Sequence, residues 1–444
     1  MSRWKEMIDL KSVLVAIASI SIGKFQRQRS FANAGINSES HVVIASETQI
    51  TAEDFLQRGS LKGNKGDFWS AIEDYSQAIG LKPDYADAYY NQGIARSGLG
   101  DKKGAIEDYT QAIKLKPDYV EAYSNRGLAR SELGDFWSAI EDYNEAIRLQ
   151  PDYAWAYSSR GIARSELGDK KGAIKDYNQA IKIKPDLAEA YSNRGVALSS
   201  LGDKKGAIED YNQAIKLKPD YAAAYYNRGV ARSGLGDREG AIEDYNQAIK
   251  LKPDYAEAYD NRGIARSKLG DKKGAIKDYN QAIKLKPDLA EAYYIRGFAR
   301  RELGDEKGAI EDYNQAIKLK LDYAEAYANR GFARRELGDE KGALEDYNQA
   351  IKLKPDYAEA YAERGTVRID LGDREGAIED YNQAIKLKPD FAVAYYNRGF
   401  ARRELGDKKG AIADYQKAAD LYKNQGKISD YQDAINQVKK LSYK

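Results

Sequence analysis

The sequence of 444 residues contains no cysteine, one histidine and nine prolines. The absence of cysteine excludes disulfides and every zinc, iron–sulfur or thiol-redox site that needs a thiolate ligand. A Ser-His-Asp triad could be built only around His41, which lies in a poorly patterned N-terminal region. Charge of one sign is also lacking, since Lys+Arg 71 nearly balance Asp+Glu 69. The chain therefore lacks the basic field on which non-specific nucleic-acid binding depends.

The few prolines reveal an internal repeat. They recur every 34 residues with one gap, at Leu321, and none lies outside the series Pro83, Pro117, Pro151, Pro185, Pro219, Pro253, Pro287, Pro355 and Pro389. With proline placed at position 32, eleven repeats run from Ala52 to Gln425. Glycine at position 8, alanine at positions 20 and 27, and tyrosine at position 24 occur in all eleven. One residue type therefore suits one geometric position throughout the array.

Each repeat predicts two helices. In the seventh repeat, Asp254 followed by Glu257 has the form of a capping box for the first helix. Gly270 can end that helix in the left-handed conformation, and Asp271 can cap the second. Proline stops the second helix, so we expect this helix to run on in the eighth repeat, where Leu321 replaces proline. Small residues at positions 8, 20 and 27 allow close helix packing, and the hairpins must stack to bury their faces.

The repeat resembles the tetratricopeptide repeat, whose 34-residue period and Gly/Ala/aromatic/Ala/Pro pattern it reproduces over residues 52–425. The resemblance implies an all-α fold, an α-solenoid in which helix-turn-helix repeats stack into a right-handed superhelix and first helices line a concave groove. Positions 7 and 11, usually leucine and tyrosine in the family, are mostly arginine here, as in Arg262 and Arg266. We interpret these arginines as structural, with stems along tyrosine rings and heads reaching acidic groups on the neighbouring helix.

The two ends of the chain differ from the repeats. Residues 427–444 predict a C-terminal capping helix, because Ser429 to Leu441 place apolar side chains on one face. Residues 1–34 resemble a signal peptide or an anchoring leader. Their apolar run from Ser12 to Gly23 is shorter than the roughly 20 residues of a membrane-spanning helix. Basic residues between this run and a possible cleavage site at residues 32–34 are unusual, so a cytoplasmic leader stays an alternative to export or tethering. Residues 35–51 form a polar linker.

The sequence contains no candidate catalytic site. No Gly-rich phosphate loop is present, and paired carboxylates such as Glu209 and Asp210 recur on an expected solvated helix face. We therefore predict no catalytic residue, no cofactor and no metal site. The favoured function is a non-enzymatic scaffold that binds a protein or peptide in the groove. The alternative is a helical-repeat binder of single-stranded nucleic acid, against which the neutral charge and the acidic position 2 argue.

The resemblance implies that positions 2, 5, 9, 12 and 13 face the groove, and that asparagine at position 6 can hydrogen-bond a peptide backbone. The asparagines counted as site candidates are Asn227, Asn261 and Asn329. The family's clamp for C-terminal carboxylates needs lysine where position 2 here is mostly acidic, so that function is not carried over. The glutamates at position 2 can serve as helix caps, as ligands, or as both.

Aromatic and arginine residues combine at the groove-facing positions of the later repeats. The candidates are Tyr294, Phe298, Arg301, Phe332, Arg335, Tyr396, Phe400 and Arg403. Binding energy concentrates in such residues, and repeats eight and nine form the continuous part. The guanidinium groups favour an acidic partner segment, and the phenylalanines favour an apolar anchor within it. Alternatively, the arginines pair with glutamates of the adjoining repeat and the phenylalanines belong to the core. Trp155, which replaces the acid at position 2, marks a second candidate region.

Overall fold

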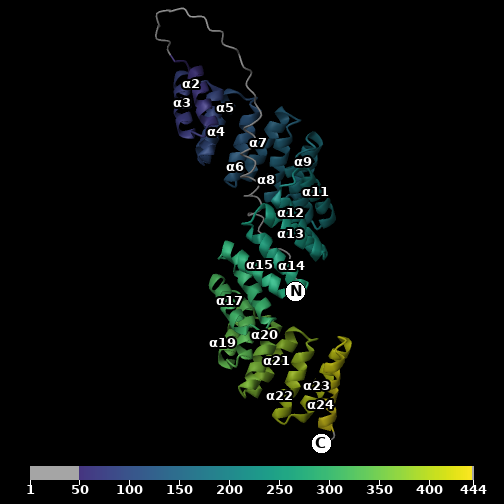
Figure 1. The fold of residues 1–444 in the computed structure, drawn as a ribbon. Helices are drawn as coiled ribbons and strands as arrows, with labels where there is room; N and C mark the ends of the chain where they lie inside the picture. Colours follow the sequence, from purple (N-terminus) through teal and green to yellow (C-terminus); the bar gives the residue numbers. More distant parts are fainter. Residues whose placement is uncertain (1–49, 443–444) are drawn as a thin grey trace, which may run out of the picture. The chain divides into compact units, whose positions relative to one another are not determined.

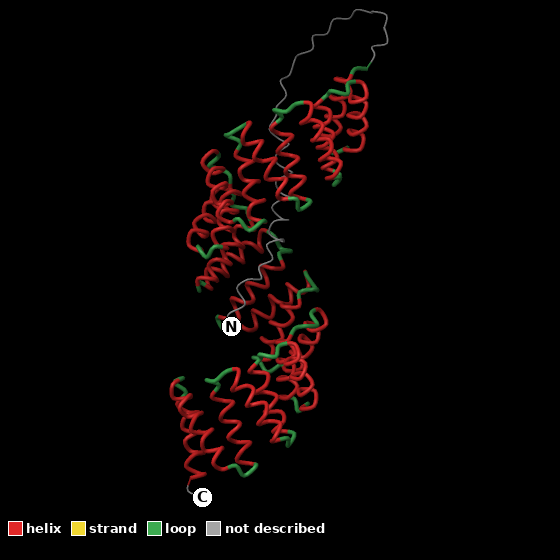
Figure 2. The backbone as a smooth tube through the Cα atoms, turned by 180° about the vertical axis from the view of Figure 1, so that it is seen from behind, coloured by secondary structure: helices red, strands yellow, loops and turns green. Residues whose placement is uncertain are grey.

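The computed structural model describes residues 50–442. The leader expected at residues 1–34, and all of the expected linker except its last two residues, lie outside the described residues. Within residues 50–442, no helix is both long and apolar enough to cross a membrane. The described chain is built from helices joined by short turns, and no strand occurs in it (Figures 1 and 2). The all-α repeat architecture expected from the sequence is confirmed.

Helices alternate regularly along the chain (Figure 1). The first helices of the repeats are α2 (Ala52–Asn64), α4 (Ala86–Gly98), α6 (Val120–Glu132), α8 (Ala154–Glu166), α10 (Ala188–Ser200), α12 (Ala222–Leu235), α14 (Ala256–Lys268), α16 (Ala290–Arg301), α18 (Ala324–Glu336), α20 (Ala358–Asp370) and α22 (Ala392–Glu404). The second helices are α3 (Phe68–Leu81), α5 (Lys102–Leu115), α7 (Phe136–Leu149), α9 (Lys170–Ile183), α11 (Lys204–Leu217), α13 (Arg238–Leu251), α15 (Lys272–Leu285), α17 (Glu306–Leu319), α19 (Glu340–Leu353), α21 (Arg374–Leu387) and α23 (Lys408–Asn424). The last helix, α24 (Ile428–Ser442), follows the eleventh repeat and packs on α23.

The described residues fall into two compact units, an N-terminal unit with α2 to α12 and a C-terminal unit with α13 to α24. Within each unit, every helix packs against the next along the chain. First helices of neighbouring repeats also touch one another, as α2 does α4 and α16 does α18, while second helices of neighbouring repeats come together less closely. In each unit the first helices therefore line the inner, concave face.

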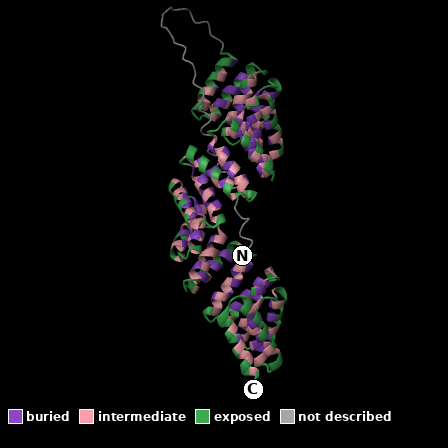
Figure 3. Cartoon of the chain, turned by 90° about the vertical axis from the view of Figure 1, so that its right-hand side faces the viewer, coloured by how far each residue is buried: buried purple, intermediate pink, exposed green. Residues whose placement is uncertain are grey.

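The recurring small and aromatic residues make this close packing possible. A Cβ atom added to Gly263 would lie 2.6 Å from the ring of Tyr279, so only glycine leaves room for that ring. Tyr279, Ala275 and Ala282 are fully buried. Buried residues of this kind gather between the helices (Figure 3). The predicted packing roles of positions 8, 20, 24 and 27 are confirmed.

The helix starts differ in part from the prediction. Asp271 caps the second helix by accepting a hydrogen bond of 2.8 Å from the Gly274 N–H, and Gly270 is left-handed with φ 91°, as expected. The capping box at the first helix is wrong, because α14 begins one residue later than that box requires. Its N-cap is Tyr255, whose side chain makes no capping bond, and Glu257 binds the Lys286 ammonium instead.

The missing proline does not extend the second helix of repeat eight, so that expectation is also wrong. Helix α17 ends at Leu319, the position at which α15 ends at Leu285. Lys320 takes an extended conformation with φ −138° and ψ 91°, and its carbonyl accepts a hydrogen bond from Tyr323 at 3.2 Å. Because Tyr323 is buried against Tyr294 of the same repeat, side-chain packing fixes this turn without help from proline.

Charged side chains join the helices through one recurring contact. Aspartate occupies position 23 in all eleven repeats. Arg262 of α14 donates to Asp278 of α15 at 2.5 Å and to Asn246 of α13 at 2.7 Å, and its guanidinium lies 5.3 Å from the Tyr259 ring centre. Arg266 donates a further hydrogen bond to Asp278, at 2.9 Å. The contacts expected for the arginines are confirmed, and one guanidinium links a repeat to the repeat before it.

Repeat two lacks this contact because Gln92 stands at position 7. Gln92 donates to the Ser76 hydroxyl at 2.7 Å, while the buried Asp108 keeps a single cation, Arg96, at 3.3 Å. Burial raises the pKa of Asp108 from 3.8 to about 7, and Arg96 opposes only part of that rise. A carboxyl group whose pKa is raised in the folded protein lowers stability progressively as pH rises from 3.8 to about 7.

Replacement of this glutamine should therefore stabilise the N-terminal unit. We expect Gln92→Arg to raise the free energy of unfolding by about 1–2 kcal/mol at pH 8, because the new guanidinium can reach Asp108. The gain should be smaller at pH 5, where the Asp108 carboxyl is protonated and holds no charge to pair. Urea denaturation at both pH values measures the effect, with Gln92→Met as the uncharged control. An equal gain at the two pH values would contradict the assignment.

A second prediction concerns Leu321, which is 73% exposed and whose N–H donates no backbone hydrogen bond among those described. The turn at Leu321 already has the geometry of the turns that contain proline. Leu321→Pro should therefore act only by lowering the conformational entropy of the unfolded chain. We expect the free energy of unfolding to rise by about 0.4–1 kcal/mol. Urea denaturation measures the effect, and Leu321→Ala serves as the control for loss of the leucine side chain. A proline variant less stable than the unaltered chain would show that this turn differs from the turns that contain proline.

Candidate partner-binding site

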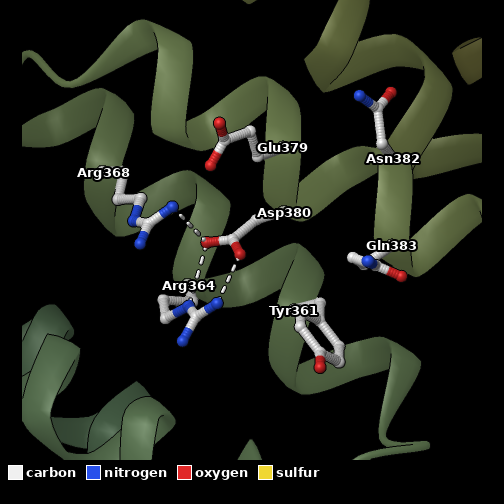
Figure 4. A pocket seen from close by; sticks show the side chains of 7 residues that line it. All are labelled: Tyr361, Arg364, Arg368, Glu379, Asp380, Asn382 and Gln383. Atoms are coloured by element: carbon white, nitrogen blue, oxygen red, sulfur yellow. Dashed lines mark hydrogen bonds and ion pairs between the residues drawn. The ribbon is translucent and has the colours of Figure 1, made fainter.

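One pocket of the C-terminal unit lies between α20 and α21 and has a volume of about 440 Å³. Figure 4 shows that Arg364, Arg368 and Asp380 point toward one another. Asp380 accepts hydrogen bonds from Arg364 at 2.5 Å and forms an ion pair with Arg368 at 3.3 Å. These are the helix-joining contacts of the repeat, so the pocket offers no unused chemistry. Within residues 50–442, no group of three or more His, Asp or Glu side chains could hold a metal ion.

The concave face of repeats eight and nine brings the predicted arginines and phenylalanines together. Arg301 of α16 lies between two rings, 4.9 Å from the centre of Phe298 and 4.5 Å from the centre of Phe332 on α18. Neither an ion pair nor a side-chain hydrogen bond engages Arg301 among the described residues. Stacking between two rings fixes the guanidinium plane while its N–H donors stay available.

Arg335 is placed differently from Arg301. Its Nε donates to Asp370 at 2.8 Å, an aspartate near the end of α20 in the next repeat. Burial raises the pKa of the Glu363 carboxyl group on α20, and the charges of Arg335 and Arg301 oppose that rise. The expected alternative, in which both arginines pair with glutamates, therefore describes neither one: Arg335 pairs with an aspartate, and Arg301 is held by rings.

Two buried tyrosines add hydrogen-bond donors beneath these arginines. The Tyr313 and Tyr347 hydroxyls are buried and have no hydrogen-bond partner among the described residues. Their rings pack against Gly297 of α16 and Gly331 of α18. Burial raises the pKa of both hydroxyls, and the positive charge of Arg301 opposes the rise in each. A buried polar group without a partner needs an explanation.

Sequence reasoning missed these hydroxyls, although one signal was present. In repeat ten, Thr366 at position 9 lies 3.2 Å from the hydroxyl of Tyr381, so position 9 can supply a partner. In repeats eight and nine this position holds Phe298 and Phe332, which cannot accept a hydrogen bond.

The other predicted residues lie apart from this pair of repeats or have structural contacts. Tyr294 accepts a hydrogen bond from Asn329 at 3.1 Å and stacks on Tyr313 and Tyr323. The third aromatic–arginine pair is used by the C-terminal helix, because Arg403 stacks on Phe400 and donates to Gln437 of α24 at 3.2 Å.

Tyr396 packs in the same C-terminal cluster, which includes Ala434 of α24. In the N-terminal unit, Trp155 packs edge-on against Tyr143 and beside Tyr153, and Asn227 is buried. Asn261 donates to the Glu257 carbonyl at 3.1 Å, within α14. The structure therefore gathers Phe298, Arg301, Phe332 and Arg335 and distributes the remaining candidates elsewhere.

Comparison with known proteins agrees with the helix pairs. A TPR repeat model matches residues 64–100, 99–134, 163–202, 199–236, 234–270, 265–304, 297–338, 333–372 and 365–406, and tetratricopeptide repeat models match residues 120–153 and 392–425. No curated protein matches the chain.

Several solved structures are similar to the chain. Yeast Tom70 is 18% identical, with a TM-score of 0.39 over 87% of this chain and 95% of its own. MamA is 30% identical, with a TM-score of 0.35 over 37% of this chain and 96% of its own. YrrB, described as a TPR protein with an unusual peptide-binding site, is 24% identical, with a TM-score of 0.36 over 42% and 96%. With family models matching most of its length, the chain belongs to the tetratricopeptide repeat family.

Proposed function

We propose that this protein is a non-enzymatic scaffold that binds a protein or peptide partner on the concave face of its C-terminal unit. Its family consists of repeat scaffolds that generally lack enzymatic activity. The proposed site, called the arginine site here, comprises Phe298, Arg301, Phe332 and Arg335. The observation that carries the proposal is the Arg301 guanidinium, which two rings orient and which forms no ion pair among the described residues.

The chemistry of the arginine site selects an acidic partner segment. Arg301 supplies several N–H donors, so the matching group is rich in acceptors. A carboxylate fits this requirement, because it can accept two parallel hydrogen bonds from one guanidinium. The edges of Phe298 and Phe332 can contact an apolar residue next to that carboxylate. We therefore infer a segment that combines an aspartate or glutamate with an apolar side chain.

A single-stranded nucleic acid is the weaker candidate for the same face. Stacking of bases needs free aromatic rings, but Arg301 already covers Phe298 and Phe332.

Charge reversal tests the arginine site. We expect Arg301→Glu combined with Arg335→Glu to weaken binding of acidic peptides at least about tenfold, because charged contacts are lost and repulsive ones are formed. A phage library of random 12-residue peptides, selected on the full chain, supplies the probes, and fluorescence anisotropy with synthetic copies measures affinity. The matched control is Lys307→Glu with Lys341→Glu, two exposed lysines on the second helices.

Circular dichroism must first show that both double variants keep their helices. Acidic peptides that bind the folded arginine variant as tightly as the unaltered chain would rule out the site.

A further inference from the structure

One groove-facing acid has no counterpart in the other repeats. Position 5 holds tyrosine, serine, alanine or leucine in ten repeats and an acid only at Asp260. Asp260 lies on α14, which touches α16, the helix that carries Phe298 and Arg301. It is therefore one repeat away from the arginine site on the same face of the C-terminal unit.

Among residues 50–442, no cation forms an ion pair with the Asp260 carboxylate. Its Oδ1 atom is buried and has no hydrogen-bond partner among the described residues. The nearby acids are Glu257 and Glu291, and each of these already has a lysine: Lys286 binds Glu257, and Lys320 lies 3.8 Å from Glu291. Burial, together with the charges of Glu291 and Glu257, raises the pKa of Asp260 to about 7. A buried and unpaired carboxylate lowers stability, so the fold itself gains nothing from it.

A buried hydroxyl accompanies this carboxylate. Tyr279 of α15 is fully buried, and its hydroxyl has no hydrogen-bond partner among residues 50–442. The Tyr279 ring packs against Gly263 of α14, three residues after Asp260, because a Cβ atom added to Gly263 would lie 2.6 Å from that ring. Burial raises the pKa of the Tyr279 hydroxyl, and the charge of Asp260 raises it further. Position 6 of the next repeat, which is usually asparagine, is Ile295 and cannot serve as a partner. The packed helices α14 and α15 thus hold a buried hydroxyl and a buried carboxylate oxygen, and neither has a hydrogen-bond partner among residues 50–442.

The combination points to a ligand group rather than to a core contact. The cationic group of a lysine or arginine side chain matches a carboxylate in an acidic surrounding, and its N–H groups can donate both to Asp260 and to the oxygen of Tyr279. Pairing would also remove the cost of leaving Asp260 unpaired.

We propose that Asp260 and Tyr279 form a cation subsite, which binds a lysine or arginine side chain of the same partner segment whose acidic residue occupies the arginine site. This inference rests on the proposed function. Because α14, α16 and α18 follow one another along the concave face, the two subsites differ in charge sign at the two ends of one groove. A bound segment then has a single favoured direction, since reversal would place its cation against Arg301 and its carboxylate against Asp260.

Peptide selection tests the cation subsite separately from the arginine site. The random 12-residue library is selected on the unaltered full chain, on Asp260→Asn and on Asp254→Asn. Asp254 is an exposed aspartate before the same helix, so its variant carries the same loss of charge. On the unaltered chain and on Asp254→Asn, we expect enriched acids together with a lysine or arginine at one constant separation. On Asp260→Asn, we expect the acids to stay enriched and the basic residue to disappear.

A thermodynamic cycle then measures the contact directly. One selected peptide and its copy with norleucine in place of lysine are titrated into the chain and into Asp260→Asn by calorimetry. We expect each change alone to weaken binding about fivefold or more, and the two together to weaken it little further, because they remove the same contact. Asp260→Asn should fold with an unchanged or raised melting temperature at pH 8, since it removes an unpaired buried charge.

The outcomes separate the two proposals. Acid enrichment without a basic residue on the unaltered chain would overturn the cation subsite and leave the arginine site standing, whereas no enrichment would overturn both. Spermidine, a free amine with the same chemistry, is titrated alone. If spermidine binds the unaltered chain but not Asp260→Asn, and no basic residue is enriched, the subsite serves a free amine and the proposal for a partner side chain is wrong.

Discussion

The structure depends on a buried aspartate that holds arginines from the facing helix. In repeat after repeat the position-23 carboxylate accepts from the position-7 guanidinium, as Asp176 does from Arg160 at 2.6 Å, and that guanidinium also donates to Asn144 of the preceding repeat at 2.6 Å. One side chain thus joins two helices of one repeat and one helix of its neighbour. Because charges buried in this way are costly unless each has its partner, the contact also selects one register between neighbouring helices. The first repeat shows the dependence, since Arg58 has no preceding repeat and its side chain is 49% exposed, against 14% for Arg160.

Because these contacts lie between the helices, the residue types on the concave face can vary from repeat to repeat. The arginine–aspartate contacts and the packing of Tyr279-like rings under glycine require fixed residue types, whereas groove-facing positions do not contribute to either. Polar groups there are therefore informative when they have no structural partner. Arg301 is held by two rings and not by an acid, while Arg300, one residue before it, lies 3.2 Å from Asp312. Neighbouring arginines in one helix thus have different roles, which the face of the helix decides.

Most of the fold could be predicted from the sequence because the same residue types occur at the same positions in eleven repeats. The Gly/Tyr contact, the left-handed glycine and the aspartate cap of the second helix all depend on neighbours within a few residues or on a fixed period. The errors arose where tertiary packing decides. The capping box failed because Tyr255, not Asp254, is the N-cap residue, and the turn at Leu321 kept its shape because Tyr323 packs into the core. Of the candidate site, sequence alone could place Phe298, Arg301, Phe332 and Arg335 on one face. It could not show that Tyr313 and Tyr347 lie beneath them without partners, because that depends on which side chains meet across helices.

Near-identity of the repeats makes single departures meaningful. A substitution that served stacking would be expected in many repeats, since stacking makes the same demand at each of them. Asp260 occurs once, beside an equally unusual Ile295, and the two changes together remove a common amide and add an unpaired acid in neighbouring first helices. Gln92 is also unique at its position, yet it has a local partner in Ser76, so its cost is limited to Asp108. Gln92 is therefore a structural variation that its neighbours accommodate. Asp260 differs, because no described neighbour pairs with it, and it becomes favourable only when a cation from outside the chain pairs with it.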